Sequence, residues 1–277
     1  AALMPTTEER FGLDNPTAWP LDIVDWRKAP VDLTFLNAAD KPAGQRGFVG
    51  VQNGRLAFAD GTAARFWGTN LTSYTLFGTA RENVCTQARR LAELGFNLVR
   101  LHHHDSSWVV PNVFGDSSVP STQSLDAAAL DKLDWWIKCL KDEGIYVWLD
   151  LHVGRELKTG DGIDDFAEIA QGRSSASFRG FNYVNDSIKR AMKRFNELYL
   201  THTNPYTRLA YKDDPAVISL LLTNENDLVR HFGNALLPDK NVPRHNATYM
   251  GLADSFANAF GLPRDQVWRS WEHGPSK

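Results

Sequence analysis

Hydrophobic and polar positions along the chain change period several times, and the changes mark a series of strands and helices. From residue 48 the sequence "FVGVQNGRLAFADGTAARF" alternates between apolar and polar residues, and Asn53 and Gly54 interrupt the alternation. Asn-Gly between two alternating segments is the strongest local signal for a β-hairpin. The pattern therefore predicts a small antiparallel β-meander over residues 48–64, preceded by an irregular arm over residues 1–47.

From residue 65 onwards short apolar runs alternate with amphipathic segments of helical period. The predicted strands cover residues 65–71, 96–104, 145–152 and 215–225, and the predicted helices cover 81–95, 124–144, 185–204 and 246–261. This alternation is typical of βα units on a parallel sheet. Short helix-to-strand connections and long segments after the strands favour a (β/α)8 barrel. A doubly wound sheet is disfavoured, because no glycine-rich phosphate loop follows a strand.

Polar side chains follow the apolar part of each predicted strand. Because side chains alternate along a strand, one set packs under the helices and the other faces the barrel axis. The residues predicted to face the axis, or to end the strands, are Asn70, Arg100, His102, His104, Asp150, His152, Asn224 and Glu225. Parallel strands place such residues together at the end of a barrel that carries the active site. The sequence thus predicts a polar cup with Glu225 in it.

Four segments give the chain a resemblance to a known family. They are "FWGTNL", "LGFNLVRLHHHD", "GIYVWLDLH" and "LLLTNEND", one on each predicted strand. Over residues 56–227 the chain resembles clan A glycoside hydrolases, most closely the cellulase- and mannanase-type enzymes of family 5. The resemblance implies that Glu225 is the general acid/base and that Asn224 contacts the sugar 2-hydroxyl. It also implies that Arg100 orients the nucleophile and that His152 lines the subsite at the scissile bond.

The implied chemistry is retaining hydrolysis of a β-linked glycan, without a cofactor. Such enzymes place two carboxyl groups roughly 5–5.5 Å apart, one as acid/base and one as nucleophile. In the family the nucleophile is a Glu at the seventh strand, whereas only four clear barrel strands are predicted here. We therefore expect residues 65–277 to form a partial barrel of four to five βα units. A second polypeptide or a missing C-terminal half would complete it and supply the nucleophile, with Glu272 in "WRSWEHG" as a weaker candidate.

Two other functions remain open from the sequence. His102 and His104, predicted on one side of a strand, have the spacing of zinc ligands on barrel strands, and Asp150 and His152 extend the set. Against a metal-dependent hydrolase, Arg100 lies on the same face and would repel a divalent cation. The other possibility is a half-barrel that binds glycans without cleaving them. The resemblance favours the glycosidase, with no metal in its site.

Aromatic residues after the strands are candidates for stacking on sugar rings. Trp108 follows the second barrel strand, and Tyr74 and Phe77 follow the first as weaker candidates. Loops carry function more often than helices do, whereas a loop aromatic can equally fill a gap. Residues 154–175 are polar and are expected to be a long loop after the third strand.

Composition narrows the partners and the location. The chain of 277 residues has a net charge of −3 and no run of Lys or Arg, which disfavours nucleic acid. No apolar run approaches the roughly 20 residues of a membrane span.

Cys85 lies near the start of one predicted helix and Cys139 near the end of another, so two parallel helices would hold them about 20 Å apart. We expect two free thiols and a secreted or periplasmic protein, with a cytoplasmic location left open.

Overall fold

The structure is a computed structural model that describes residues 29–226 and 242–263. The predicted arm over residues 1–47 falls largely outside the described residues. Its described part contains the short 3-10 helix η1, Thr34–Asp40, which contacts helix α3. The division of the chain into arm, meander and partial barrel stays a prediction.

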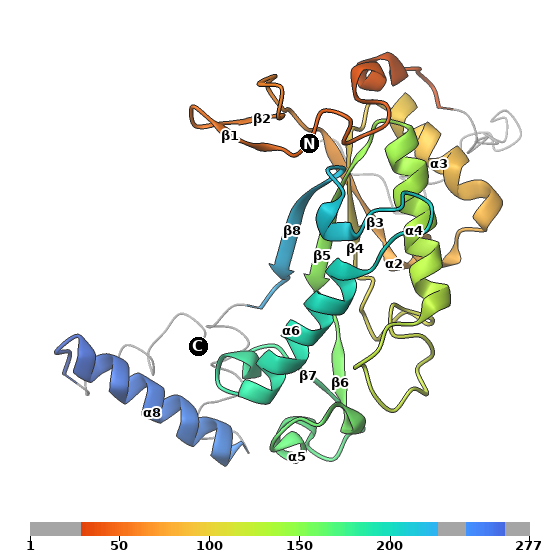
Figure 1. Ribbon diagram of the computed structural model, residues 1–277. Coiled ribbons are helices and arrows are strands. Elements are labelled where there is room, and N and C mark those ends of the chain that lie inside the picture. The colour runs from red at the N-terminus through yellow and green to blue at the C-terminus, as the bar shows by residue number, and fades with distance from the viewer. Residues whose placement is uncertain (1–28, 227–241, 264–277) are drawn as a thin grey trace, which may run out of the picture.

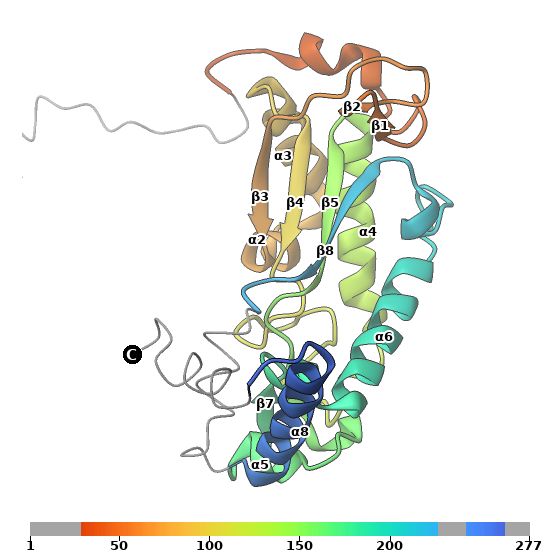
Figure 2. The ribbon, with the colours of Figure 1, turned by 90° about the vertical axis from the view of Figure 1, so that its left-hand side faces the viewer.

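A four-stranded sheet forms the centre of the molecule, and all three of its strand pairings are parallel. Its order is β3-β4-β5-β8, and Figure 2 shows the four strands side by side in that order. The strands are β3 (Gly68–Thr72), β4 (Leu98–His102), β5 (Tyr146–His152) and β8 (Val217–Thr223). The strands and helices alternate as in the first half of a barrel. The predicted α/β fold is therefore confirmed, and each predicted strand is found within a few residues of its expected position.

Helices cover one face of this sheet, as Figure 1 shows for α3 and α4. The helices next to the sheet are α2 (Ser73–Gly78), α3 (Arg81–Glu93), α4 (Ala127–Asp142) and α6 (Asp186–Thr201). Helix α8 (Pro243–Ala259) lies away from the sheet (Figure 1). Alternate residues of the strands, among them Val99 and Leu149, are fully buried in one core with residues of α3, α4 and α6. The side chain of Asp126 accepts a hydrogen bond from the backbone of Ala129 and so caps α4.

The predicted hairpin is present, and it lies at the amino-terminal end of the strands of the central sheet. β1 (Gly50–Gln52) pairs antiparallel with β2 (Arg55–Ala57), and Asn53 and Gly54 both have positive φ in the turn between them. Next to this hairpin Phe58 packs on Tyr146, with ring centroids 5.6 Å apart. Tyr146 is the first residue of β5, so the hairpin region covers the amino-terminal end of the sheet and leaves the carboxyl end open.

Residues 154–175 are not the long polar loop that the sequence suggested. They begin a small folded unit that comprises β6 (Glu156–Lys158), η2 (Thr159–Asp161), α5 (Phe166–Ala170), β7 (Ser175–Ser177) and η3 (Phe181–Tyr183). A further 3-10 helix, η4 (Tyr211–Asp213), precedes β8 and is not part of this unit. β6 and β7 are antiparallel. Leu157, Ile169 and Phe178 are buried in its own apolar cluster. The apolar residues of this segment stand singly among many polar ones and show neither a strand nor a helix period. The hydrophobic pattern therefore did not predict this unit.

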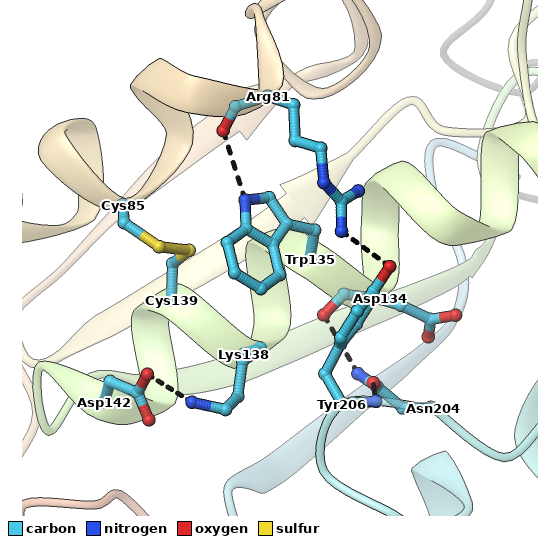
Figure 3. Close-up of a disulfide and its surroundings, with 9 residues drawn as sticks. All are labelled: Arg81, Cys85, Asp134, Trp135, Lys138, Cys139, Asp142, Asn204 and Tyr206. Atoms are coloured by element: carbon cyan, nitrogen blue, oxygen red, sulfur yellow. Dashed lines mark hydrogen bonds and ion pairs between the residues drawn. A yellow bond between two sulfur atoms is a disulfide. The ribbon is translucent and has the colours of Figure 1, made fainter.

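The expectation of two free thiols is wrong, because Cys85 and Cys139 form a disulfide with their Cα atoms 4.8 Å apart (Figure 3). The expectation compared the positions of the cysteines from the starts of their helices. The structure instead aligns α3 and α4 at their ends, since Leu98 of β4 lies level with Tyr146 of β5. From those ends the cysteines are offset by only about five residues, roughly 7.5 Å of helix.

Among the described residues, no helix combines the length and the apolar character that a bilayer crossing needs.

Candidate active site

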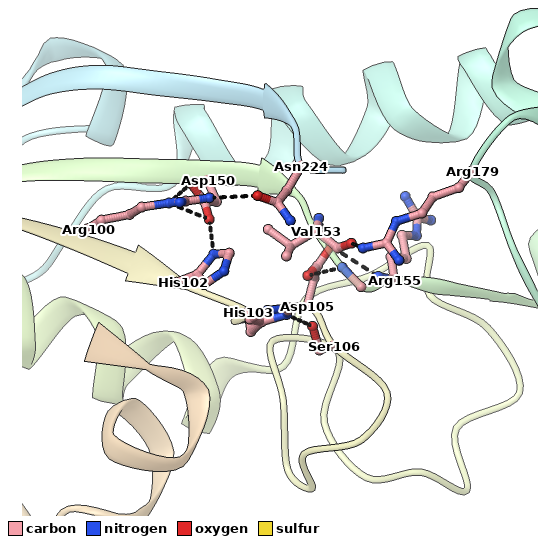
Figure 4. Close-up of polar contacts among 11 residues, drawn as sticks. Arg100, His102, His103, Asp105, Ser106, Asp150, Val153, Arg155, Arg179 and Asn224 are labelled. Carbon is pink, nitrogen blue, oxygen red and sulfur yellow. Dashed lines mark hydrogen bonds and ion pairs between the residues drawn. The ribbon is translucent and has the colours of Figure 1, made fainter. Parts of the chain in front are cut away.

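Three strands bring Arg100, Asp150 and Asn224 together at the carboxyl end of the sheet (Figure 4). Nε of Arg100 donates to both oxygens of the Asp150 carboxylate, at 2.9 and 3.1 Å. Nη2 of the same guanidinium donates to Oδ1 of Asn224 at 3.0 Å. The Asp150 side chain is fully buried, whereas that of Arg100 is partly exposed. The network thus fixes the guanidinium and the amide at the mouth of the open end.

His102 joins this network through the same carboxylate. Its Nδ1 lies 2.5 Å from Oδ2 of Asp150, so one carboxylate holds both the arginine and the histidine of β4. The sequence placed Asp150 on the axis-facing side but assigned it no part in a glycosidase site. The signal was available, because Arg100 and His102 alternate on β4 and Asp150 alternates with His152 on the neighbouring strand.

Glu225 lies in the first turn after β8, where it is exposed and has a left-handed φ of 48°. The residues on either side of it are anchored. The backbone N–H of Asn224 donates to the carbonyl of His152 at 2.8 Å, and the buried Asn226 side chain accepts from the Gly180 N–H at 3.0 Å. Within the described part of the chain the Glu225 carboxylate accepts no hydrogen bond. Its backbone is thus held on both sides, and the described residues leave its carboxylate without a hydrogen-bond donor.

His104 does not lie beside His102, as strand alternation had suggested. β4 ends at His102, and His103 has a φ of 63°, which turns the chain and reverses the side to which the next residue points. His104 is fully buried and stacks on Tyr199 of α6, with ring centroids 5.0 Å apart and nearly parallel planes. Burial lowers the pKa of His104 below its usual range. The structure places it in the core between the sheet and α6.

His152 is also almost completely buried, at the end of β5. Its ring packs against Phe178 and Phe195, with centroids 5.7 and 5.0 Å away. Burial is the main reason that the pKa of His152 falls from 6.5 to about 4. The imidazole is therefore neutral at neutral pH, and in this structure it lies beneath the open end of the sheet.

Asp105 organises the loop that follows β4, a role that the sequence pattern does not indicate. Its carboxylate accepts hydrogen bonds from the backbone N–H groups of Val153, Gly154 and Arg155, at 2.9, 2.9 and 3.2 Å (Figure 4). The loop after β4 is thereby joined to the chain that leaves β5. A single Asp in a loop carries no sequence signal for this, because the three donors belong to a segment about fifty residues away.

The other predicted substrate-binding residues lie at the β3 side of the site. Asn70 is exposed on β3 and pairs in register with Arg100 of β4. Trp108 is half-exposed in the loop after β4 and contacts Tyr74 of α2. Phe77, by contrast, is buried in the main core. Glu272, the weaker candidate for the nucleophile, lies outside the described residues.

Metal ligation was the main alternative that the histidines suggested. Across residues 29–226 and 242–263, no group of three or more His, Cys, Asp or Glu side chains is arranged to hold a metal ion. His102 and His104 do not form the expected pair, because His102 contacts Asp150 whereas His104 is buried against Tyr199 of α6.

Comparisons with known proteins support the fold that the geometry describes. No family model matches the sequence, and no curated protein sequence matches it. Among solved structures, the chain is similar to an endo-1,4-β-mannanase from Rhizomucor miehei, with a TM-score of 0.51 and 21% identity over 66% of this chain and 50% of that one. It also matches a glycoside hydrolase family 5 mannosidase from the same organism, with a TM-score of 0.48, 14% identity and coverage of 72% and 55%.

The chain spans about half the length of these solved structures. The likeness to the mannanase shows the fold: a parallel βα array that corresponds to about half of that enzyme. The resemblance predicted from the sequence is confirmed at this level.

Proposed function

We propose that the protein is a glycoside hydrolase that cleaves a β-linked glycan with retention, and that Glu225 is its general acid/base. The observation that carries the proposal is the fixed position of Glu225. It follows Asn224, whose amide is bound to Arg100, at the carboxyl end of a parallel sheet with a family 5 type fold. Active sites of barrel enzymes are built at that end.

The neighbouring groups suit the reaction. Protonating the glycosidic oxygen requires a carboxyl group that the substrate can reach, and the exposed Glu225 side chain meets this condition. The Asn224 amide keeps its N–H groups available for a sugar hydroxyl, because Arg100 uses only its oxygen. Asn70 and His102 line the same open end from β3 and β4.

Retention requires a second carboxylate, which would act as nucleophile. We propose that it comes from polypeptide that completes the barrel beside β8. Two observations support such a neighbour. Within the described residues β8 pairs only with β5, and its side chains Leu220 and Leu222 are exposed. An unpaired strand edge with exposed apolar side chains is normally covered in a native protein.

The disulfide bears on where this reaction would take place. Disulfides persist in secreted and periplasmic proteins and are rare in the reducing cytosol. The Cys85–Cys139 bridge therefore supports a secreted or periplasmic location.

The test of the acid/base assignment is Glu225→Gln in the complete protein. Removing the acid should lower the hydrolysis of native glycans about 10²–10⁴-fold. Activated aryl glycosides should lose less, because their leaving groups need little protonation. Glu197→Gln on the exposed surface of α6 is the matched control and should leave both rates unchanged. Equal rates for Glu225→Gln and the parent would refute the assignment, and glycan binding without turnover in the parent would indicate a non-catalytic protein.

A further inference from the structure

The backbone at Glu225 adopts a conformation that a glutamate rarely takes. Its φ of 48° lies in the left-handed region, where the Cβ atom of an ordinary residue crowds the following carbonyl oxygen. Asparagine enters this region more readily, and Asn224 and Asn226 stand on either side of Glu225, yet the strained conformation falls on the glutamate. Such a conformation persists only where the surrounding structure holds it, and it is concentrated at functional sites.

Asn226 holds the chain on the carboxyl side of Glu225. The residue is buried, and both ends of its amide are used. Oδ1 accepts from the Gly180 N–H at 3.0 Å, and Nδ2 donates to Oδ1 of Asn182 at 3.1 Å. The backbone carbonyl of Asn226 accepts from the Tyr183 hydroxyl at 2.6 Å. All three partners belong to residues 180–183, so a single segment of the chain fixes Asn226.

The segment 180–183 belongs to the small unit that contains β6 and β7, and it is not part of the parallel sheet. Figure 1 shows this unit beyond the carboxyl ends of β5 and β8. Phe181 anchors the segment, because it is buried in the apolar cluster of the unit. On the other side of Glu225, the Asn224 N–H continues the pairing of β8 with β5 through the His152 carbonyl. The sheet therefore holds one side of the glutamate, and the small unit holds the other.

We infer that Asn226 and residues 180–183 position the acid/base carboxyl, an inference that rests on the proposed function. No described residue donates a hydrogen bond to the Glu225 carboxylate, so its direction depends on the backbone that carries it. The left-handed conformation sets the direction of the Cα–Cβ bond, and the contacts of Asn226 maintain that conformation. A general acid has to lie within hydrogen-bond distance of the glycosidic oxygen, and a small misplacement slows the reaction strongly. Asn226 and Tyr183 are thus positioning residues that act through Glu225.

The test measures kcat/KM of the complete protein on mannopentaose, cellopentaose and xylopentaose, and on the dinitrophenyl β-glycosides of the same sugars. This constant reports the steps up to the first bond cleavage, in which Glu225 would act as acid. Asn226→Ala should lower kcat/KM about tenfold on the pentaose that the parent cleaves fastest. The matching dinitrophenyl glycoside should keep the parent value, because its leaving group needs little protonation. Tyr183→Phe, which removes only the hydroxyl, should show the same selectivity with a smaller loss.

Asn204→Ala and Tyr206→Phe are the matched controls. Asn204 is buried like Asn226, and its Nδ2 donates to the backbone carbonyl of Asp134 on α4 at 3.0 Å. The Tyr206 hydroxyl donates to Asp131 on the same helix. Both controls remove hydrogen bonds away from the candidate site. They should lower the stability of the protein and leave the ratio of the two kcat/KM values, pentaose to dinitrophenyl glycoside, as it is in the parent.

This ratio separates positioning from a purely structural role. The inference is overturned if Asn226→Ala and Tyr183→Phe keep the parent ratio, or if the controls change it as much. Should Asn226→Ala fail to fold, Tyr183→Phe decides alone. The proposed function fails separately, when the parent cleaves none of the three pentaoses or when Glu225→Gln leaves their hydrolysis unchanged.

Discussion

Arg100 of β4 and Asp150 of β5 form an ion pair across two neighbouring parallel strands, with Nε and Oδ1 2.9 Å apart. The carboxylate is fully buried and also holds His102, and the guanidinium holds Asn224. Removing the charge of Asp150 therefore loosens three side chains of the candidate site at once.

Asp150→Asn should lower the free energy of unfolding by about 3 kcal/mol, because it leaves the partly buried Arg100 without its counter-charge. Chemical denaturation of the variant and the parent measures the difference. Asp142→Asn breaks the exposed ion pair of Asp142 with Lys138 on α4 and should cost less than about 1 kcal/mol. Similar costs for the two variants would mean that burial of the Arg100–Asp150 pair contributes little.

Gly154 is required by the close approach of Ser106. A Cβ atom on Gly154 would stand 2.1 Å from Oγ and 2.8 Å from Cβ of Ser106. Gly154→Ala should therefore displace the loop after β4 and destabilise the fold by about 1–3 kcal/mol. Thermal unfolding checks this, with Gly50→Ala as control, since no atom lies within 4 Å of the added Cβ there. An unchanged Tm for Gly154→Ala would show that the loop moves aside without cost.

The disulfide gives a chemical prediction. The oxidised protein should contain no reactive thiol under denaturing conditions, and two after reduction, as a thiol-reactive dye can count. Cys85 and Cys139 are 54 residues apart in sequence, so Cys85→Ser/Cys139→Ser should lower the free energy of unfolding by about 4 kcal/mol. Reduction should have the same effect on the parent and none on the double variant. Two thiols in the unreduced protein would contradict the bridge.

Because His152 is buried in its neutral form, we expect the free energy of unfolding to fall in acid. Burial lowers its pKa from 6.5 to about 4, so the unfolded chain takes up a proton at a higher pH than the folded protein. The contribution of His152 is complete above about pH 6.5 and is lost as the pH falls towards 4, by about 3 kcal/mol in total. The lowered pKa of His104 acts in the same direction. The free energy of unfolding, measured from pH 7 to 4, should depend less steeply on pH in His152→Gln than in the parent. An identical slope would show that His152 does not contribute to the acid sensitivity.

Most of the central sheet could be predicted from the sequence, because each strand is a short apolar run bounded by an amphipathic helix. The alternation of Arg100 and His102 against Asp150 also placed three site residues on one face. The alternation rule failed just beyond the end of β4, because the left-handed backbone of His103 directs the side chain of His104 into the core. Alternation is a property of extended backbone, and a sequence does not show where the extension stops.

Two further features depended on relations that no local pattern records. The unit that contains β6 and β7 is stabilised by widely spaced apolar residues such as Leu157 and Phe178, which meet only after the chain has turned. The disulfide depends on the stagger of α3 against α4, which the register of β4 and β5 sets. Both features follow from tertiary placement.

The Cys85–Cys139 bridge encloses the chain from the first half of α3 to the last turn of α4, including the loop that carries Trp108. A protease that cuts this loop would leave two pieces that are still covalently joined. The nicked protein would keep its mass on a non-reducing gel and separate into fragments only after reduction. The loop that carries Trp108 can therefore be cleaved in a protease-rich environment without the release of either piece.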